Sequence, residues 1–374
     1  MVSKRVLAIK PSGIREIFEM ATNGAINLGL GELDFEPPQE ARDAYKEALD
    51  QDGNHYGPTK GIDPLRKLVA GKVQKYRKDI TMDNVVITAS GTQGTMATFQ
   101  TLFDKGDEVL IPEPGFVLYE PDSTLAEAVP VPYPLRHEEH FQPDIEAIKE
   151  RITPRTKGIV VNSPSNPTGS VLNLESFKAI KDLASDHDLW IISDEVYEDY
   201  IYHGMHHSFS EVIERAVVLN SFSKSFAVPG WRIGFLTAPL EVVNHIANMQ
   251  YHLVACPPTP PQIALAKAFG AQEAFVKTVV PIFKRRRKTM IDGLNEIEGF
   301  HCHLPQGAFY AFPGYKQKIP SRDLAHKLVA KGVICAPGTA FGEMGENHLR
   351  FSYAASEENI TNGLAIVKKV VEGL

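Results

Sequence analysis

Five short runs of apolar, mostly β-branched residues recur between about residue 84 and residue 240. They lie at 84–88, 108–111, 158–161, 189–192 and 216–219. Continuous apolar runs of this length are typical of strands buried on both faces, as in a parallel sheet between two layers of helices. Residues 174–186 carry apolar side chains at steps of three and four, which predicts an amphipathic helix between two of the runs. The pattern therefore predicts an α/β fold with a doubly wound, mostly parallel sheet.

The rest of the chain predicts a smaller α+β domain. After residue 281 come a charged helical stretch and short predicted strands at 308–312, 332–336 and 349–353. The first 40 residues do not fit the central alternation, and Pro37-Pro38 precedes a predicted helix. We expect an N-terminal segment over 1–40 that packs with the small domain, a large domain over 41–280 and a small domain over 281–374.

The charge balance argues against nucleic-acid binding. Lys and Arg number 39 and Asp and Glu number 46, for a net charge of −7, whereas affinity for nucleic acid comes mainly from neutralising phosphates. The basic run at 284–288 has no aromatic residues interleaved with it, so we interpret it as the solvated face of a helix.

Neither a membrane span nor a secretory signal is predicted. No uncharged apolar run approaches the roughly 18 residues that a spanning helix needs, and the first residues lead into no apolar segment of signal-peptide length. We expect a cytosolic protein without a membrane partner. The three cysteines, Cys256, Cys302 and Cys335, lie far apart and predict neither a disulfide framework nor a Cys-rich zinc site.

Two histidine-rich segments were weighed as metal sites. His137-Glu138-Glu139-His140 lacks the His-Glu-x-x-His spacing that places two histidines on one helical face, so a solvated loop is the simpler interpretation. His301 and His303 lie in a predicted strand and would share a face, but no third ligand is near them in the sequence. We therefore expect no bound metal.

A glycine-rich turn, Ser90-Gly91-Thr92-Gln93-Gly94, follows the first predicted strand and precedes a helix predicted over about 95–103. Such a turn offers backbone N–H groups to an anion, most often phosphate. The same kind of turn also serves simple packing. It matches neither the dinucleotide-binding nor the nucleotide-triphosphate glycine pattern.

Asp194 and Lys224 follow two other predicted strands, at the edge where parallel sheets bind ligands. A carboxylate at the end of a buried strand is costly unless paired, although Asp194 could simply begin the next turn. Lys224, after Ser223, is a candidate amine nucleophile whose pKa burial would lower. A snorkelling surface lysine is the alternative.

Taken together, the ordered motifs resemble the fold-type I pyridoxal 5′-phosphate enzymes, specifically the class I aminotransferases of the aspartate and aromatic subgroup. The resemblance covers nearly the whole chain. Its motifs are Tyr56-Gly57-Pro58-Thr59-Lys60-Gly61, Pro114-Gly115-Phe116, Asn166-Pro167-Thr168-Gly169, Asp194 with Tyr197, Ser223-Lys224 with Arg232, and His348-Leu349-Arg350-Phe351-Ser352-Tyr353.

The resemblance implies a role for each of these residues around the cofactor. Lys224 would form the imine with the cofactor aldehyde and later move the substrate's Cα proton. Asp194 would keep the pyridine nitrogen protonated, while Asn166 and Tyr197 would bond the 3′ oxygen and Phe116 would stack on the ring. The implied phosphate ligands are Gly91, Thr92, Ser221, Ser223, Arg232 and, from the neighbouring subunit of a homodimer with shared active sites, Tyr56.

The resemblance also implies how the amino acid and 2-oxo acid substrates bind. Arg350 would grip the α-carboxylate, with Gly31, Asn166 and Phe116 beside it; a structural ion pair is the alternative for Arg350. Ser12 matches a position that lies over the substrate in aspartate aminotransferases of the subgroup.

The donor and acceptor expected from the resemblance are aspartate and 2-oxoglutarate. Some bacterial aspartate enzymes carry a lysine where this chain has Thr92, so Arg15 becomes the candidate for the distal carboxylate, although a surface arginine is equally compatible with the sequence. An aromatic or alanine aminotransferase, a β-lyase of the same fold and an amino-acid-sensing regulator are the alternatives.

Overall fold

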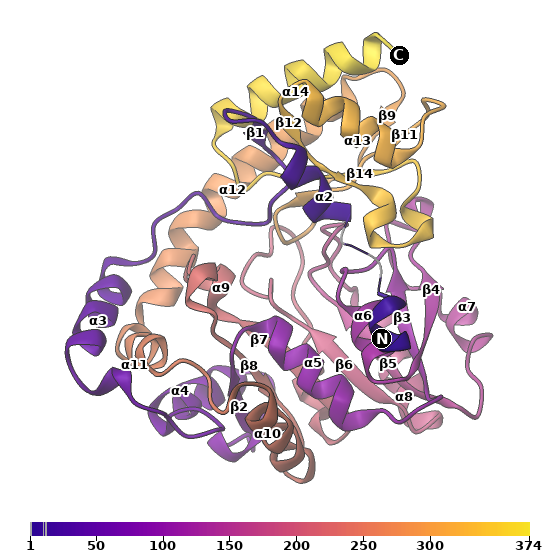
Figure 1. The fold of residues 1–374 in the computed structure, drawn as a ribbon. Helices are drawn as coiled ribbons and strands as arrows, with labels where there is room; N and C mark the ends of the chain where they lie inside the picture. Colours follow the sequence, from indigo (N-terminus) through magenta and orange to yellow (C-terminus); the bar gives the residue numbers. More distant parts are fainter. Residues whose placement is uncertain (1, 10, 12) are drawn as a thin grey trace.

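The computed structural model describes residues 2–9, 11 and 13–374. Its centre is a seven-stranded sheet in the order β2-β8-β7-β6-β5-β3-β4 (Figure 1). The strands are β2 (Val85–Thr88), β3 (Glu108–Glu113), β4 (Val129–Pro134), β5 (Thr156–Asn162), β6 (Trp190–Asp194), β7 (Ala216–Ser221) and β8 (Gly234–Thr237). Only β8 runs antiparallel to its neighbours β2 and β7. The predicted α/β fold with a mostly parallel sheet is confirmed.

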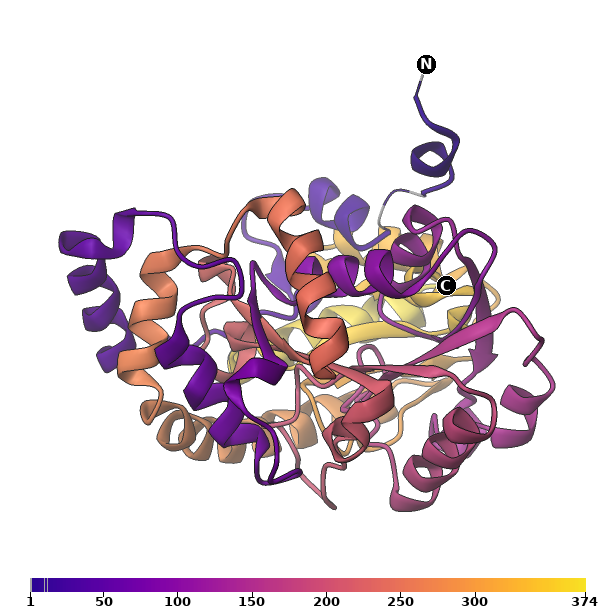
Figure 2. The ribbon, with the colours of Figure 1, turned by 90° about the horizontal axis from the view of Figure 1, so that it is seen from below.

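Helices cover both faces of this sheet, which explains why the strands are apolar throughout (Figures 1 and 2). Neighbouring residues of a strand point to opposite faces. Ile159 of β5 packs in a cluster with α8 (Leu174–Asp186), whereas Val160 packs in another with α5 (Gly91–Leu102) and α10 (Leu240–Val254). The remaining helices of the large layer structure are α3 (Gln39–Asp50), α4 (Asp63–Val73), α6 (Tyr119–Leu125), α7 (Ile145–Lys149), α9 (Phe222–Ser225) and α11 (Thr259–Ala268).

Two strands and one helix start differ from the sequence predictions. β4 was not predicted because it contains Pro130, Pro132 and Pro134. It lies at one edge of the sheet, where proline is tolerated because a strand with one neighbour does not need a backbone N–H donor on its open side. β8 is too short and too poor in β-branched residues to stand out. The predicted helix over 95–103 begins earlier, at Gly91, so the glycine-rich turn is its first turn.

The C-terminal part is built on short strands beside long helices (Figure 1). The order β10-β14-β13 forms an antiparallel sheet, β9 pairs with β11, and β1 from the N-terminal segment pairs in parallel with β12. These elements are β1 (Ile26–Asn27), β9 (Phe300–His301), β10 (Tyr310–Ala311), β11 (Gly314–Tyr315), β12 (Val333–Ile334), β13 (Ala336–Pro337), β14 (Leu349–Ser352), α13 (Ser321–Ala330) and α14 (Glu357–Glu372). The strand predicted around 301–303 ends at His301, so His303 lies beyond it.

The helix α12 (Ala271–Asn295) runs continuously through the predicted domain boundary at 280/281. The division into three segments therefore remains a prediction. The prediction that the basic run of α12 forms a solvated face was wrong for Arg286. This residue is 8% exposed and donates hydrogen bonds of 2.6 and 2.8 Å to Asp34. This ion pair ties α12 to the N-terminal segment, whose helices are α1 (Lys4–Leu7) and α2 (Gly13–Met20). No helix in the described part of the chain is both long and apolar enough to cross a membrane.

Candidate active site

Residues from four predicted motifs meet at one edge of the central sheet. Asn162 and Asp194, the last residues of β5 and β6, lie opposite each other in register. Ser221 ends β7 and Lys224 follows it in α9. Gly91 opens α5 just after β2. Because the carboxyl ends of parallel strands share an edge, residues far apart in the sequence become neighbours here.

The Lys224 amine contacts backbone rather than a carboxylate. Its Nζ donates a 2.5 Å hydrogen bond to the carbonyl oxygen of Gly31. Desolvation lowers the pKa of Lys224 to about 8; the nearby Glu32 carboxylate opposes this, and the Arg232 and Arg350 cations add to it. A large fraction of the amine is therefore neutral near pH 8, as a nucleophile or base requires.

Asp194 is a buried carboxylate with hydrogen-bond donors but without a basic partner among the described residues. The Tyr119 hydroxyl donates to its Oδ2 over 2.7 Å, and the Val196 N–H donates to Oδ1 over 3.3 Å. Desolvation raises the pKa of Asp194 to about 6, while these two donors pull the pKa down. The carboxylate is thus ionised at neutral pH, in surroundings that favour a positive group next to it.

Two tyrosines connect the sheet edge to the C-terminal strands. The hydroxyl groups of Tyr197 and Tyr310 share a 2.8 Å hydrogen bond, and both side chains are buried. A Cβ atom added to Gly31 would collide with the Tyr310 hydroxyl. Gly31 is therefore required for the close approach that also brings its carbonyl to Lys224.

Arg350 is a buried cation without a carboxylate partner in the described part of the chain. Its Nη1 donates to Asn166 Oδ1 over 2.9 Å and its Nη2 donates to the Gly29 carbonyl, while its buried Nε has no partner among the described residues. The Tyr310 ring lies 4.7 Å from Cζ. Burial lowers the pKa of Arg350. A buried guanidinium held only by neutral groups favours binding of an anion.

A set of donors lies between β7 and the start of α5. Ser221 Oγ is 2.9 Å from Ser223 Oγ, and both serines are buried. The N–H groups of Gly91 and Thr92 lie in the first turn of α5, where a helix has no acceptor of its own for them. Arg232 is exposed and bonds the Pro229 carbonyl over 2.7 Å. Hydroxyls, helix N–H groups and a guanidinium together suit a phosphate-like anion.

The other predicted site residues lie at the margin or on the surface. Phe116 packs edge-on against Tyr119 with ring centroids 6.1 Å apart. It therefore lies next to the tyrosine that bonds Asp194. Tyr56 is 94% exposed. The Arg15 side chain is 81% exposed, with its Nε 3.6 Å from Glu19. Ser12 lies outside the described residues.

Tyr119 and Tyr310 are site residues that sequence reasoning missed. Tyr119 lies three residues after Phe116, yet its partner Asp194 is 75 positions away. Tyr310 was placed in a predicted strand without a role, and its partner Tyr197 is 113 positions away. Only Tyr119 had a signal in the sequence, because it lies three residues after the Pro114-Gly115-Phe116 motif.

One group of three residues in the described part of the chain has the spacing of metal ligands: Glu195, Glu198 and His206. These carboxylates are already compensated, because Lys72 Nζ lies 2.8 Å from Glu198 and His206 lies 2.9 Å from Glu195. We interpret the group as a structural ion-pair network behind Asp194.

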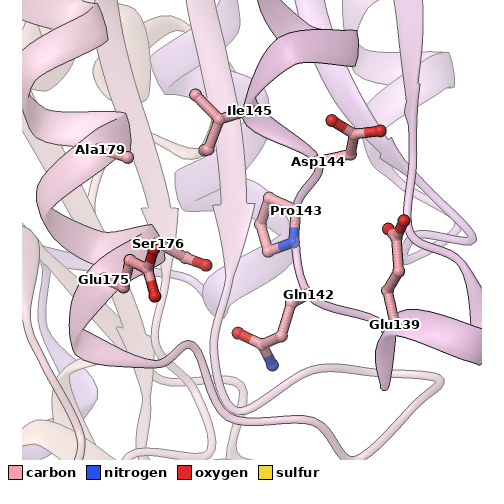
Figure 3. Close-up of a pocket in the computed structure, with 8 residues that line it drawn as sticks. All are labelled: Glu139, Gln142, Pro143, Asp144, Ile145, Glu175, Ser176 and Ala179. Atoms are coloured by element: carbon pink, nitrogen blue, oxygen red, sulfur yellow. The ribbon is translucent and has the colours of Figure 1, made fainter.

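A separate pocket opens between α7 and α8 (Figure 3). Two of its polar side chains, those of Asp144 and Gln142, are already bonded within the fold. Asp144 caps α7 and pairs with Arg136 at 2.7 Å, and Gln142 bonds the Val171 carbonyl at 3.1 Å. This pocket carries none of the site residues described above.

Comparison with known proteins agrees with this geometry. The sequence model of the family described as aminotransferase class I and II matches residues 23–367. The chain is 41% identical to the probable aspartate aminotransferase of Methanocaldococcus jannaschii over 100% of both chains. It is 37% identical to aromatic-amino-acid aminotransferase 2 of Thermococcus litoralis over 99% of this chain and 98% of that one.

A solved structure agrees as well. The aspartate aminotransferase from Thermus thermophilus with maleate superposes with a TM-score of 0.94, at 35% identity over 99% of both chains. A family match over most of the chain, together with relatives above 30% identity along their full length, shows that the chain belongs to the class I and II aminotransferases.

Proposed function

We propose that this aminotransferase uses pyridoxal 5′-phosphate to move the amino group of aspartate to 2-oxoglutarate. One observation carries the proposal. Lys224 Nζ and Arg350 Nη2 bond the carbonyls of Gly31 and Gly29, so a low-pKa amine and a guanidinium without a carboxylate partner among the described residues flank the same short stretch of backbone. An amino acid held by its carboxylate on Arg350 would present its α-amino group towards Lys224.

The donor set described above fits the cofactor. Its phosphate would be held by Gly91, Thr92, Ser221, Ser223 and Arg232. Asp194 would hold the proton on the ring nitrogen, Asn166 and Tyr197 would bond the 3′ oxygen, and Phe116 would stack on the ring. When bound, the cofactor supplies a ring that accepts the electron pair left at the substrate's Cα.

The chain's own residues would then handle the proton and the carboxylate. The Lys224 amine, largely neutral near pH 8, would take the proton from Cα. Arg350 would orient the substrate by a bidentate pair with the α-carboxylate, replacing its present bond to Asn166. The Tyr197–Tyr310 hydroxyl pair would relay hydrogen bonding between the cofactor side and the substrate side of the site.

Aspartate is the proposed donor because two compared proteins are named aspartate aminotransferases and one of them was solved with the four-carbon dicarboxylate maleate. The aromatic relative keeps an aromatic donor as the second candidate. Arg15 and Ser12 remain the predicted contacts of the distal carboxylate. The exposed position of Arg15 on α2 means that it would have to turn inward to reach the substrate.

A homodimer with shared active sites is part of the proposal. Tyr56 is 94% exposed although it is a large aromatic residue in a segment resembling the family's phosphate-binding loop. Exposure of this kind fits a side chain that completes the neighbouring subunit's site. The cytosolic location stays a prediction from the sequence.

The test of the donor is a comparison of kcat/KM for aspartate, phenylalanine, tyrosine and alanine with 2-oxoglutarate as acceptor. Aspartate is expected to be best. A tenfold or greater preference for phenylalanine or tyrosine would overturn the acidic assignment. Product analysis separates the β-lyase alternative, because transamination of aspartate gives oxaloacetate and glutamate in equal amounts.

A further inference from the structure

Five histidines from distant parts of the sequence gather in one cluster outside the active site. The ring centroid of His137 lies 4.5 Å from that of His301, 4.2 Å from His303 and 5.5 Å from His348, and His140 lies 4.2 Å from His303. His137 and His140 belong to the 3₁₀ turn His137–Glu139 and its C-cap, after β4, whereas His301 ends β9, His303 follows β9 and His348 directly precedes β14. The sequence predicted no site at 137–140, which lacks the His-Glu-x-x-His spacing, or at 301–303, which has no third ligand nearby in the sequence.

Gly314 aligns two of these imidazoles. It pairs with His301 across β9 and β11 and forms an isolated bridge with His348 on its other side. Residues directly opposite in neighbouring strands project from the same face. A Cβ atom on Gly314 would lie 2.6 Å from His301 Nε2 and 3.2 Å from His348 Nε2. Both nitrogens therefore lie over the glycine, in space that any other residue would fill.

Backbone carbonyls fix which nitrogen carries the proton in two of the rings. His348 Nδ1 lies 3.0 Å from the Glu346 carbonyl oxygen, and His303 Nε2 lies 2.9 Å from the His137 carbonyl oxygen. A carbonyl only accepts, so these nitrogens carry hydrogen, and the opposite nitrogen of each neutral ring has a free lone pair. Histidines that bind metals have this arrangement, with one N–H on a carbonyl and the other nitrogen bare.

Two ring nitrogens of the cluster are buried without a partner in the described part of the chain. His348 Nε2 and His137 Nδ1 are both buried and neither has a hydrogen-bond partner there. Imidazole nitrogens that the fold leaves without a hydrogen-bond partner are ligands for divalent metals of borderline softness.

We propose that His137, His301 and His348 bind a divalent transition-metal ion, with Zn²⁺ as the representative, and that His303 offers a fourth imidazole. The ring nitrogens of these histidines do not yet lie within the mutual 4.8 Å spacing of ligands around one ion, so the rings must rotate to reach the Zn–N distance of about 2.0–2.1 Å. The ion joins the segment after β4 to the C-terminal strands. His348 lies two residues before Arg350, so the site is next to the strand that carries the proposed substrate arginine. This inference does not depend on the proposed donor or cofactor.

The test is a Zn²⁺ titration of protein that has no polyhistidine tag and has been stripped with a chelator, using competition with a chromophoric chelator as the readout. We expect one tight Zn²⁺ per chain and no binding of Mg²⁺, which prefers oxygen ligands. His137→Ala and His348→Gln are each expected to weaken Zn²⁺ affinity by about 100-fold or more. His245→Ala, an exposed histidine on α10, is the matched control and leaves the affinity unchanged.

Folding and stability provide the second readout. His301 is exposed, so the substitution His301→Gln leaves the interior intact. Circular dichroism checks that each variant is folded. Zn²⁺ is expected to raise the thermal midpoint of the wild-type protein but not that of His301→Gln, because the ion binds only the folded cluster. Absence of saturable binding at about 1 mM Zn²⁺, or affinity unchanged in all three cluster variants, overturns the proposal.

Discussion

The Tyr119 hydroxyl donates a 2.7 Å hydrogen bond to Asp194 Oδ2 at the buried end of β6. Burial raises the pKa of Asp194 to about 6, and the tyrosine bond opposes that rise by stabilising the carboxylate. Tyr119, together with the Val196 N–H, therefore helps to keep Asp194 ionised at neutral pH. Since the proposed chemistry needs that negative charge, the bond links a residue of α6 to catalysis.

Tyr119→Phe is expected to raise the pKa of Asp194 further. A hydrogen bond to a charged group is worth about 1.5–3 kcal/mol, which corresponds to roughly 1–2 pH units. The acid limb of the kcat/KM profile should therefore move to higher pH by about 1 unit, with activity largely recovered above it. Tyr133→Phe is the control, because Tyr133 is buried in the same region but bonds the Val160 carbonyl instead. A shift of equal size in both variants would contradict the assigned role.

Asp194→Asn is expected to stabilise the cofactor-free protein while abolishing transamination. The folded-state pKa of Asp194 lies above 3.8, so this group costs stability as the pH rises from about 4 through about 6, and the full cost is present at pH 7. Removing the charge should therefore increase the free energy of unfolding by about 2–3 kcal/mol at pH 7. Urea unfolding of the two cofactor-free proteins measures this. The gain should vanish below about pH 4. A lower free energy of unfolding for Asp194→Asn than for the wild-type protein at pH 7 would show that the charge does not destabilise the fold.

Arg350→Ala should impair every amino acid donor alike. The variant leaves the substrate α-carboxylate without its charge-assisted partner, at a cost of roughly 2–5 kcal/mol, or about 30- to 4,000-fold in kcat/KM. Arg350→Lys keeps the charge but loses the planar fork. Its kcat/KM is expected to lie between the values of the wild-type protein and of Arg350→Ala. If only acidic donors were affected, Arg350 would be reading the side chain and not the α-carboxylate.

Tyr56→Phe tests the shared active site. The phenol is expected to supply one hydrogen bond to the neighbouring subunit's cofactor phosphate, worth about 1 kcal/mol, so cofactor retention should weaken about fivefold. Equilibrium dialysis measures the cofactor affinity, and light scattering reports the oligomeric state. Tyr251→Phe, an exposed tyrosine on α10, serves as control. Full activity from protein that scatters as a monomer would contradict a site built from two chains.

The sequence predicted the residues at the strand ends far better than the contacts between them. Lys224 and Asp194 stood out because a charged residue directly after a buried apolar run needs a reason to be there. Gly31 was expected beside the substrate carboxylate but not as the partner of Lys224, and Tyr119 was not predicted at all, because the hydrogen bonds join positions 193 and 75 residues apart. Local pattern contains no information about such contacts, which depend on how strands and helices stack.

The same limit explains the larger misses. β4 was overlooked because its prolines argue against a central strand, and only the sheet order shows that it lies at an edge. Arg286 was assigned to a solvated face because its neighbours are basic, yet Asp34 from the N-terminal segment pairs with it in the interior. The histidine cluster escaped because His137 and His301 become neighbours only in the folded chain.

The account depends most on Lys224 as the residue that carries the cofactor. Borohydride reduction of protein loaded with pyridoxal 5′-phosphate, followed by digestion and mass spectrometry, locates the attached group directly. The account predicts a pyridoxyl mass on the peptide containing Lys224, and loss of both that mass and the visible absorbance in Lys224→Ala. A pyridoxyl mass on another lysine, such as the buried Lys72 of the ion-pair network, would contradict the site proposed here.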